Sequence, residues 1–198
     1  MIVNLNTDQT LYVVGESPTA DNIMYFLGLD YSNIQNITAE EFYTLPPDSQ
    51  FILGVFNTNF RLAFFQNNKS KNCCPTYIHP DATVISPEYI GKGSIIWPKS
   101  YLGCNVKVGN FCIVSQFCSL GHSATLGNNC VLSPGTIIGG STQIGDNVYF
   151  GQSSSIKDKI NICNNVEFAM TSVVTRDITE SGEYFGSKKS GLLKGKFK

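Results

Sequence analysis

His122 and Gly140 stand eighteen positions apart and carry groups that could share one reaction. An imidazole accepts protons near neutral pH, and a glycine exposes its backbone N–H group without a shielding side chain. Acyl transfer from a thioester to an amine or a hydroxyl needs both, because the acceptor loses a proton and a tetrahedral oxyanion forms. Whether the two groups meet depends on the elements that carry them.

A repeat of six residues indicates what those elements are. Neither the helical period of 3.6 nor the strand period of 2 explains a strict six, whereas three short strands per coil do. Each coil then uses eighteen residues, and coils stack about 4.8 Å apart, which gives about five coils. Every sixth position is aliphatic or Phe: Ile78, Val84, Ile90, Ile96, Leu102, Val108, Val114, Leu120, Leu126, Leu132, Ile138, Ile144, Phe150, Ile156, Ile162, Phe168 and Val174.

Two other positions of the hexad are restricted in size. Glycine follows the apolar residue in eight hexads, which we attribute to a tight backbone bend at a corner. These glycines are Gly91, Gly103, Gly109, Gly121, Gly127, Gly139, Gly145 and Gly151. The fifth position is small, as suits the inside of a narrow prism, in Ala82, Ser94, Ser100, Cys112, Cys118, Ala124, Cys130, Thr136, Thr142, Ser154 and Ser172. Coils of eighteen residues place His122 beside Gly140 at one corner.

Residues 1–75 have a different pattern, which predicts a small α/β domain. Residues 10–15 predict a buried strand, 18–29 a helix, and 51–56 a second strand with a short helix after it. Residues 38–41 fit a capping box. The alternation predicts a Rossmann-like parallel sheet. The first strand ends in Gly15, Glu16 and Ser17, where nucleotide-binding units hold a phosphate, and an ordinary strand-to-helix turn is the simpler explanation of these residues.

Composition excludes several functions. Lys and Arg total 14 against 15 Asp and Glu, so no overall field favours nucleic acid or an anionic membrane. The chain shows neither a signal peptide nor a long apolar run, and we expect a cytoplasmic protein with reduced, mostly structural thiols. A metal-dependent carbonic anhydrase on a similar prism needs three histidine ligands, and the chain has only His79 and His122.

With the α/β part before the repeat, the chain resembles the NeuD/PglD-like sugar acetyltransferases, hexapeptide-repeat enzymes of bacterial surface glycan biosynthesis. The resemblance covers nearly the whole chain. It rests on Gly15, Arg61 and the segments 78–82 (IHPDA), 120–127 (LGHSATLG), 132–135 (LSPG) and 138–140 (IGG). It implies a nucleotide-sugar-binding domain over residues 1–75, and a left-handed β-helix acyltransferase domain with a C-terminal tail over residues 76–198.

The resemblance also implies a reaction. Acetyl-CoA would acetylate an amino group of a nucleotide-linked sugar without a metal, in clefts between the prisms of a homotrimer. His122 would be the general base, and the backbone N–H of Gly140 would stabilise the oxyanion. The cofactor would contact Val131, Gln152 and Met170, and the nucleotide sugar Gly15, Glu16 and Ser17.

Two departures from the family leave alternatives open. Ser123 stands where the family has an acidic residue after its catalytic histidine, and GSKK at 186–189 replaces the family's Gly-x-Pro-Ala-Lys. Lys188 and Lys189 could pair with CoA phosphates or belong to a solvated basic tail. The acceptor could instead be a hydroxyl of a sialic-acid-type sugar. The chain could also be a non-catalytic β-helix that serves as a scaffold. His122 would then be a surface residue without a role, and Gly140 would be present because the corner needs a backbone conformation that glycine adopts.

Overall fold

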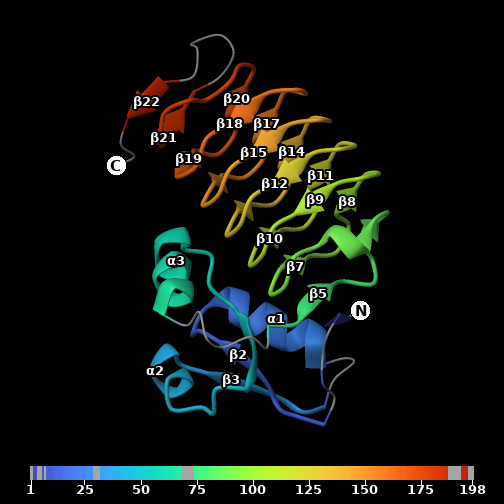
Figure 1. The fold of residues 1–198 in the computed structure, drawn as a ribbon, viewed down its shortest axis with the longest axis vertical. Helices are drawn as coiled ribbons and strands as arrows, with labels where there is room; N and C mark the ends of the chain where they lie inside the picture. Colours follow the sequence, from blue (N-terminus) through green and yellow to red (C-terminus); the bar gives the residue numbers. More distant parts are fainter. Residues whose placement is uncertain are drawn as a thin grey trace. The chain divides into compact units, whose positions relative to one another are not determined.

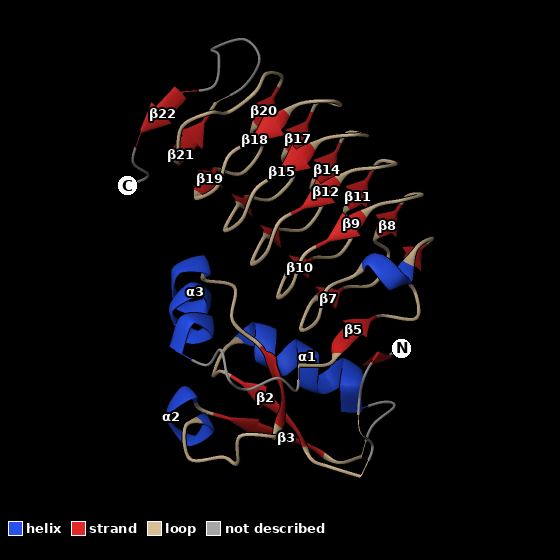
Figure 2. Cartoon of the chain, viewed as in Figure 1, coloured by secondary structure: helices blue, strands red, loops and turns tan. Residues whose placement is uncertain are grey.

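The computed structural model describes residues 2–3, 6, 8–28, 32–67, 74–186 and 193–195. The chain divides between Thr76 and Tyr77 into two compact units. Figure 1 labels their helices and strands, and Figure 2 draws helices in blue and strands in red. The α-helices of the described residues all precede the coiled part of the chain in sequence. None of these described helices has the length and hydropathy needed to span a bilayer.

The first unit contains a three-stranded parallel sheet. The helices and strands of this unit are, in chain order, β1 (Ile2–Val3), β2 (Leu11–Val14), α1 (Pro18–Gly28), β3 (Ile34–Ile37), α2 (Ala39–Phe42), β4 (Gln50–Leu53) and α3 (Thr58–Asn67). The strand order is β3-β2-β4, so β2 is central. The strands expected at 10–15 and 51–56, the helix expected at 18–29 and the short helix expected after residue 56 are confirmed. Strand β3 was not predicted, because it is an edge strand that leaves Gln35 and Asn36 exposed.

The core of this unit is aromatic on one side of the sheet. Phe42 packs against Phe51 and Phe64, with ring centroids 4.6 and 4.8 Å apart. The predicted capping box positions Phe42 by starting α2: Glu41 N donates to Thr38 Oγ1 over 3.1 Å, and Thr38 N donates to Glu41 Oε2 over 2.8 Å. Buried residues of the central strand, Val13 and Val14, complete the core.

The second unit is a left-handed parallel β-solenoid of about six turns, one more than expected. One face contains β5 (Thr76–Ile78), β7 (Ile95–Ile96), β10 (Ile113–Val114), β13 (Val131–Leu132), β16 (Tyr149–Phe150) and β19 (Val166–Phe168). The next contains β6 (Thr83–Val84), β8 (Tyr101–Leu102), β11 (Ser119–Leu120), β14 (Ile137–Ile138), β17 (Ser155–Ile156) and β20 (Val173–Val174). The third contains β9 (Lys107–Val108), β12 (Thr125–Leu126), β15 (Gln143–Ile144) and β18 (Asn161–Ile162).

Partners on neighbouring coils are eighteen residues apart, as the repeat predicted. Leu120, for example, pairs with Leu102 on one side and Ile138 on the other. The column from Ile96 to Val174 is buried, and so are the small residues of the fifth position from Ser94 onward. Figure 1 shows the resulting stack of coils from β5 to β20. The apolar core therefore runs along the axis and leaves the corners to solvent.

Both ends of the solenoid depart from the regular coil. A short 3-10 helix, η1 (Pro87–Tyr89), lies in the first coil. At the other end Ile162 bridges to Ile178, which is sixteen residues away, so the period of eighteen ends after Val174. Strand β21 (Gly182–Phe185) then continues the first face in parallel with β19, and β22 (Leu193–Gly195) pairs with β21 in antiparallel orientation.

The corners use a different residue from the one predicted. Every sixth residue from 93 to 171 has a left-handed backbone, with φ between 54° and 74°, and only Gly93 and Gly135 among them are glycine. The glycines that follow the core residue do not adopt this conformation, so their assignment to the bend was wrong. They are needed because the next coil passes close by: a Cβ on Gly121 would lie 2.6 Å from the backbone nitrogen of Gly140.

Candidate active site

Three corners join the faces of the solenoid, and the residue two places after each core residue lies at a corner. The histidine corner consists of Cys104, His122, Gly140 and Asp158. The asparagine corner consists of Lys92, Asn110, Asn128, Asp146 and Asn164. The glutamine corner consists of Gln116, Pro134, Gln152 and Met170. Each set is a column in which successive residues belong to successive coils.

His122 lies directly against Gly140, as the spacing of eighteen predicted. Ser141 N donates to His122 O over 2.8 Å, which fixes the register of the two coils. A Cβ on Gly140 would lie 2.9 Å from His122 Nε2 and 3.1 Å from its Cδ2. Gly140 has no left-handed φ, so the backbone conformation does not require glycine at this position. The missing side chain instead makes room for the imidazole, which excludes the conformational explanation for Gly140.

The N–H group of Gly140 makes no hydrogen bond within the described residues. At the asparagine corner, the N–H groups in the same position of the hexad are hydrogen-bonded to side chains of the next coil. Asn128 N donates to Asp146 Oδ1 over 2.6 Å, and Asp146 N donates to Asn164 Oδ1 over 2.8 Å. Asp158 follows Gly140 in the same way but does not accept its N–H. A donor without an acceptor therefore lies beside an exposed imidazole, which is the pair that acyl transfer needs.

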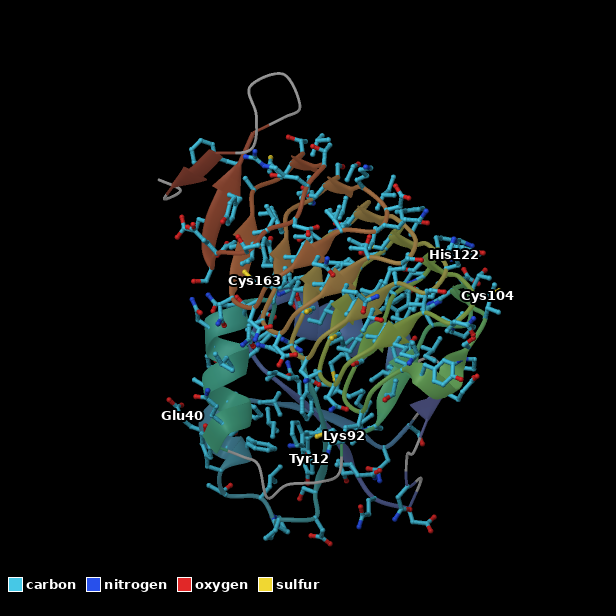
Figure 3. All side chains as sticks on the ribbon, turned by 45° about the horizontal axis from the view of Figure 1, so that its top comes forward. Tyr12, Glu40, Lys92, Cys104, His122 and Cys163 are labelled. Atoms are coloured by element: carbon cyan, nitrogen blue, oxygen red, sulfur yellow. The ribbon has the colours of Figure 1, made fainter. Side chains whose placement is uncertain are left out.

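Two residues of the histidine corner were not identified from the sequence. Cys104 is an exposed, free cysteine on the coil before His122, and Ser123 N donates to Cys104 O over 2.9 Å. Figure 3 shows Cys104 and His122 at the same edge of the coiled unit. Asp158 lies on the coil after Gly140. Counting by eighteen in both directions from His122 would have found them.

Ser123, the residue after His122, is one of the left-handed corner residues, with φ at 59°.

Gln152 and Met170, which we expected near the cofactor, also lie on neighbouring coils. Thr171 N donates to Gln152 O over 2.7 Å, both side chains are exposed, and neither residue's N–H has an acceptor among the described residues. Val131 is different: its side chain is fully buried, and its N–H donates to Val148 O over 2.9 Å. The glutamine corner therefore offers backbone donors, whereas Val131 lies in the wall of the solenoid.

The turn after β2 brings Gly15, Glu16 and Ser17 to the start of α1. Gly15 has φ at 129°, and a Cβ there would lie 2.7 Å from Val55 Cγ2, so only glycine fits. Ser17 Oγ donates to Gly54 O over 2.6 Å and accepts from Ala20 N over 3.2 Å, as a helix N-cap does. Glu16 is exposed. Ser17 therefore ties the first turn of α1 to the end of β4.

The sheet reverses its direction of winding beside this turn. From central β2 the chain crosses to β3 on one side and then returns to β4 on the other. In open α/β sheets such a reversal leaves a crevice at the carboxyl ends of the strands, where ligands bind. Arg61 is fully buried, and its Nη1 donates to Val55 O over 2.8 Å and to Leu53 O over 3.3 Å. Arg61 thus organises the segment after β4.

The described cysteines are free. Burial raises the pKa of Cys118 to about 12 and the pKa of Cys130 well above its ordinary value, so both thiols stay protonated inside the prism. Among the residues that the structure describes, no cluster of three His, Cys, Asp or Glu side chains could hold a metal. The predicted roles of Lys188 and Lys189 lie outside the described residues.

Neither a family model nor a curated protein matches the chain. Solved structures do. The acetyltransferase domain of PglB from Neisseria gonorrhoeae has 21% sequence identity and a TM-score of 0.84, over 94% of this chain and 99% of that one. A perosamine N-acetyltransferase variant from Caulobacter crescentus, in complex with CoA and GDP-perosamine, has 16% identity and a TM-score of 0.82, over 95% and 97%. WeeI from Acinetobacter baumannii has 17% identity and a TM-score of 0.76, over 90% and 97%.

At these identities the likeness concerns the fold. It extends over nearly the whole of this chain and of each neighbour, and therefore includes both units. The resemblance inferred from the sequence is confirmed at this level: the chain has the fold of the hexapeptide-repeat sugar acetyltransferases.

Proposed function

We propose that the chain is an acetyl-CoA-dependent acetyltransferase that acts in the cytoplasm on an amino group of a nucleotide-linked sugar. The observation that carries the proposal is the pair at the histidine corner, where the imidazole of His122 lies against Gly140 and the N–H of Gly140 has no acceptor among the described residues. The structural neighbours support this proposal. Two of them are acetyltransferases, and the structure of one of these contains CoA and GDP-perosamine.

The two groups would divide the chemistry between them. Acetyl-CoA supplies the acetyl thioester. His122 Nε2 accepts the proton that the acceptor amine loses as its nitrogen bonds to the acyl carbon, and then returns this proton to the thiolate as the C–S bond breaks. The Gly140 N–H donates to the oxygen that becomes negative in between, and one such donor contributes about 100-fold or more to the rate.

The cofactor would bind along the glutamine corner. Gln152 and Met170 offer two backbone N–H groups on neighbouring coils, and Val131 would contribute to the adjoining wall. The face between the glutamine and histidine corners exposes Tyr101 and Ile137, 45% and 51% accessible. A single convex corner encloses little of a ligand, so we infer a homotrimer in which a second copy completes each cleft. Light scattering that gives a monomeric mass would contradict this part of the proposal.

The first unit would hold the nucleotide of the acceptor as a small Rossmann-like domain. Support comes from the reversal of winding between β2 and β4 and from the turn of Gly15, Glu16 and Ser17 at the start of α1. Backbone N–H groups at a helix start favour phosphate oxygens. Gly15 N donates to Ile37 O and Ala20 N to Ser17 Oγ, whereas the N–H groups of Glu16 and Ser17 have no acceptor among the described residues. Titration of the full chain with GDP or UDP, each without the sugar, would measure this binding separately from turnover.

The direct test is release of free thiol from acetyl-CoA. Purified protein would be incubated with acetyl-CoA and with GDP-perosamine, with a panel of UDP- and dTDP-linked amino sugars, or with sugars that offer only hydroxyl groups. A rate well above that of a His122→Ala control, with a product heavier by one acetyl group, is expected. Thiol release only with hydroxyl acceptors would favour a sugar O-acetyltransferase. If no acceptor led to thiol release, the proposal of an acetyltransferase would be overturned and a non-catalytic scaffold would be favoured.

A further inference from the structure

Asp158 continues the column formed by His122 and Gly140. Strand β14 pairs with β17 in the register Ile137 with Ser155, which places Asp158 next to Gly140 on the following coil. Lys159 N donates to Gly140 O over 3.0 Å, which fixes this contact. Gly140 has no side chain, so none from this column fills the space between His122 and Asp158.

The Asp158 carboxylate is exposed and is not used by the fold. It makes no hydrogen bond and no ion pair within the described residues, although Lys157 and Lys159 flank it. Asp146 occupies the same position of the hexad at the asparagine corner, and its Oδ1 accepts the N–H of the preceding coil over 2.6 Å. One aspartate therefore stabilises the backbone, whereas the other leaves both its carboxylate and the neighbouring N–H available.

We propose that Asp158 binds the amino group of the acceptor and holds it over Gly140 within reach of His122. Neighbouring coils lie about 4.8 Å apart, so the Cα atoms of His122 and Asp158 are about 10 Å apart. A nitrogen between the two side chains can be about 3 Å from a carboxylate oxygen and from Nε2. The proposal rests on the proposed acetyl transfer and adds the residue that recognises the acceptor.

The charge of Asp158 selects for an amine. An aliphatic amine is protonated near neutral pH, and an ammonium donates a charge-assisted hydrogen bond to a carboxylate. A sugar hydroxyl is neutral and gains less from the same contact. The bound ammonium releases one proton to solvent before attack, and the second proton, which the nitrogen loses as it bonds to the acyl carbon, is directed at the imidazole. Asp158 thus supplies, from two coils away, an acidic group at a corner where Ser123 supplies none.

The test compares two isosteric substitutions at the same hexad position in full-length protein. Asp158→Asn removes the charge at the histidine corner, and Asp146→Asn removes one at the asparagine corner while it keeps an oxygen acceptor. Initial rates would be measured with GDP-perosamine, or the best amino sugar of the panel, and separately with acetyl-CoA as the varied substrate. Thermal unfolding of each variant checks that it folds.

For Asp158→Asn we expect the KM for the amino sugar to rise about tenfold or more, with the KM for acetyl-CoA unchanged. Asp146→Asn should leave both constants within about twofold. Asp158→Glu, which keeps the charge, should restore part of the loss. An active wild-type protein whose KM does not respond to Asp158→Asn would overturn the role of Asp158 and leave the acetyltransferase standing.

Binding separates the two proposals if no acceptor of the panel is turned over. Calorimetry would compare a nucleotide amino sugar with the same nucleotide sugar bearing a hydroxyl in place of the amine. Wild-type protein should prefer the amine by about tenfold, and Asp158→Asn should lose this preference. Equal affinities of wild-type protein for the two sugars would contradict the recognition of an ammonium.

Discussion

The histidine and asparagine corners have the same backbone and different uses. At both corners a residue with a left-handed φ follows the outward-pointing residue, and the coils keep the same spacing of eighteen. The asparagine corner fills the outward positions with Asn and Asp, whose oxygens accept the N–H groups of the preceding coil. The histidine corner has Cys104, His122 and Gly140 on three successive coils instead, followed by Asp158, which accepts no such N–H group among the described residues. The candidate site therefore lies at a corner that lacks the stabilising ladder of the asparagine corner.

A second ladder strengthens the contrast. At the left-handed position of the asparagine corner, Asn129 Nδ2 donates to Asn147 Oδ1 over 3.0 Å, and Asn147 Nδ2 donates to Asn165 Oδ1 over 3.1 Å. The matching residues of the histidine corner, Ser123 and Ser141, form no such ladder among the described residues. The asparagine corner therefore contributes stability through its side chains, whereas the histidine corner does not form this ladder among the described residues.

His122→Ala gives the largest expected effect. Loss of the base should lower kcat by about 100-fold or more, whereas the thermal midpoint should stay near that of the wild type, because the side chain is exposed. Steady-state thiol release and calorimetry measure the two quantities. Activity near the wild-type value would assign proton transfer to a different residue.

Gly140→Ala should come next. The new Cβ would lie 2.9 Å from His122 Nε2, so the imidazole must move away while the N–H donor stays in place. A displacement of this size at a reacting group costs about 10- to 100-fold in kcat. The double variant with His122→Ala tests whether Gly140→Ala lowers kcat by displacing the imidazole. If it does, the double variant should have the same kcat as His122→Ala alone. Additive losses would show that Gly140 acts independently of His122.

Alkylation of Cys104 probes the same corner without mutation. A maleimide should react first with this thiol, because among the described cysteines Cys104 is exposed, Cys163 is half-buried and the others are buried. Burial also raises the pKa of Cys118 and of Cys130. The adduct would lie beside His122 and should lower activity about tenfold by obstructing the acceptor. Cys104→Ser should be active and resistant to the reagent. Inactivation of this variant at the same rate would locate the sensitive thiol elsewhere.

The smallest effect is expected for Asn128→Ala at the asparagine corner. It removes the acceptor of Asn110 N, a bond of 2.9 Å, and should cost about 1 kcal/mol of unfolding free energy. The thermal midpoint should then fall by about 2–4 °C with kcat unchanged. A loss of turnover comparable with that of His122→Ala would abolish the distinction between the two corners.

The sequence predicts the solenoid well because burial of an apolar residue at every sixth position leaves little freedom in the fold. It also predicts that His122 meets Gly140, since this follows from the spacing alone. The reason for the glycines was wrong because corner residues such as Lys99 and Phe117 adopt a left-handed backbone without a glycine to mark it. A polar edge strand such as β3 has no apolar pattern to reveal it.

The candidate site was less predictable than the fold. Cys104 and Asp158 have ordinary side chains for a surface corner, and only their place in the column connects them with His122. Whether such a side chain finds a partner depends on the folded corner. Asp146 and Asp158 have the same hexad position, yet Asp146 accepts a backbone N–H and Asp158 accepts none within the described residues. Burial of Val131 likewise depends on the assembled wall of strands.

Strands on neighbouring coils pair eighteen residues apart, so the position of each corner residue depends on the exact length of the coils before it. An insertion or deletion that shifts the strand register between His122 and Asp158 would take these residues out of one column, so the proposed site requires this register to be kept. Beyond Asp158, each coil depends mainly on its neighbours, and whole coils of eighteen residues could be gained or lost. In the evolution of such chains, length differences should therefore come in steps of eighteen and avoid these few coils.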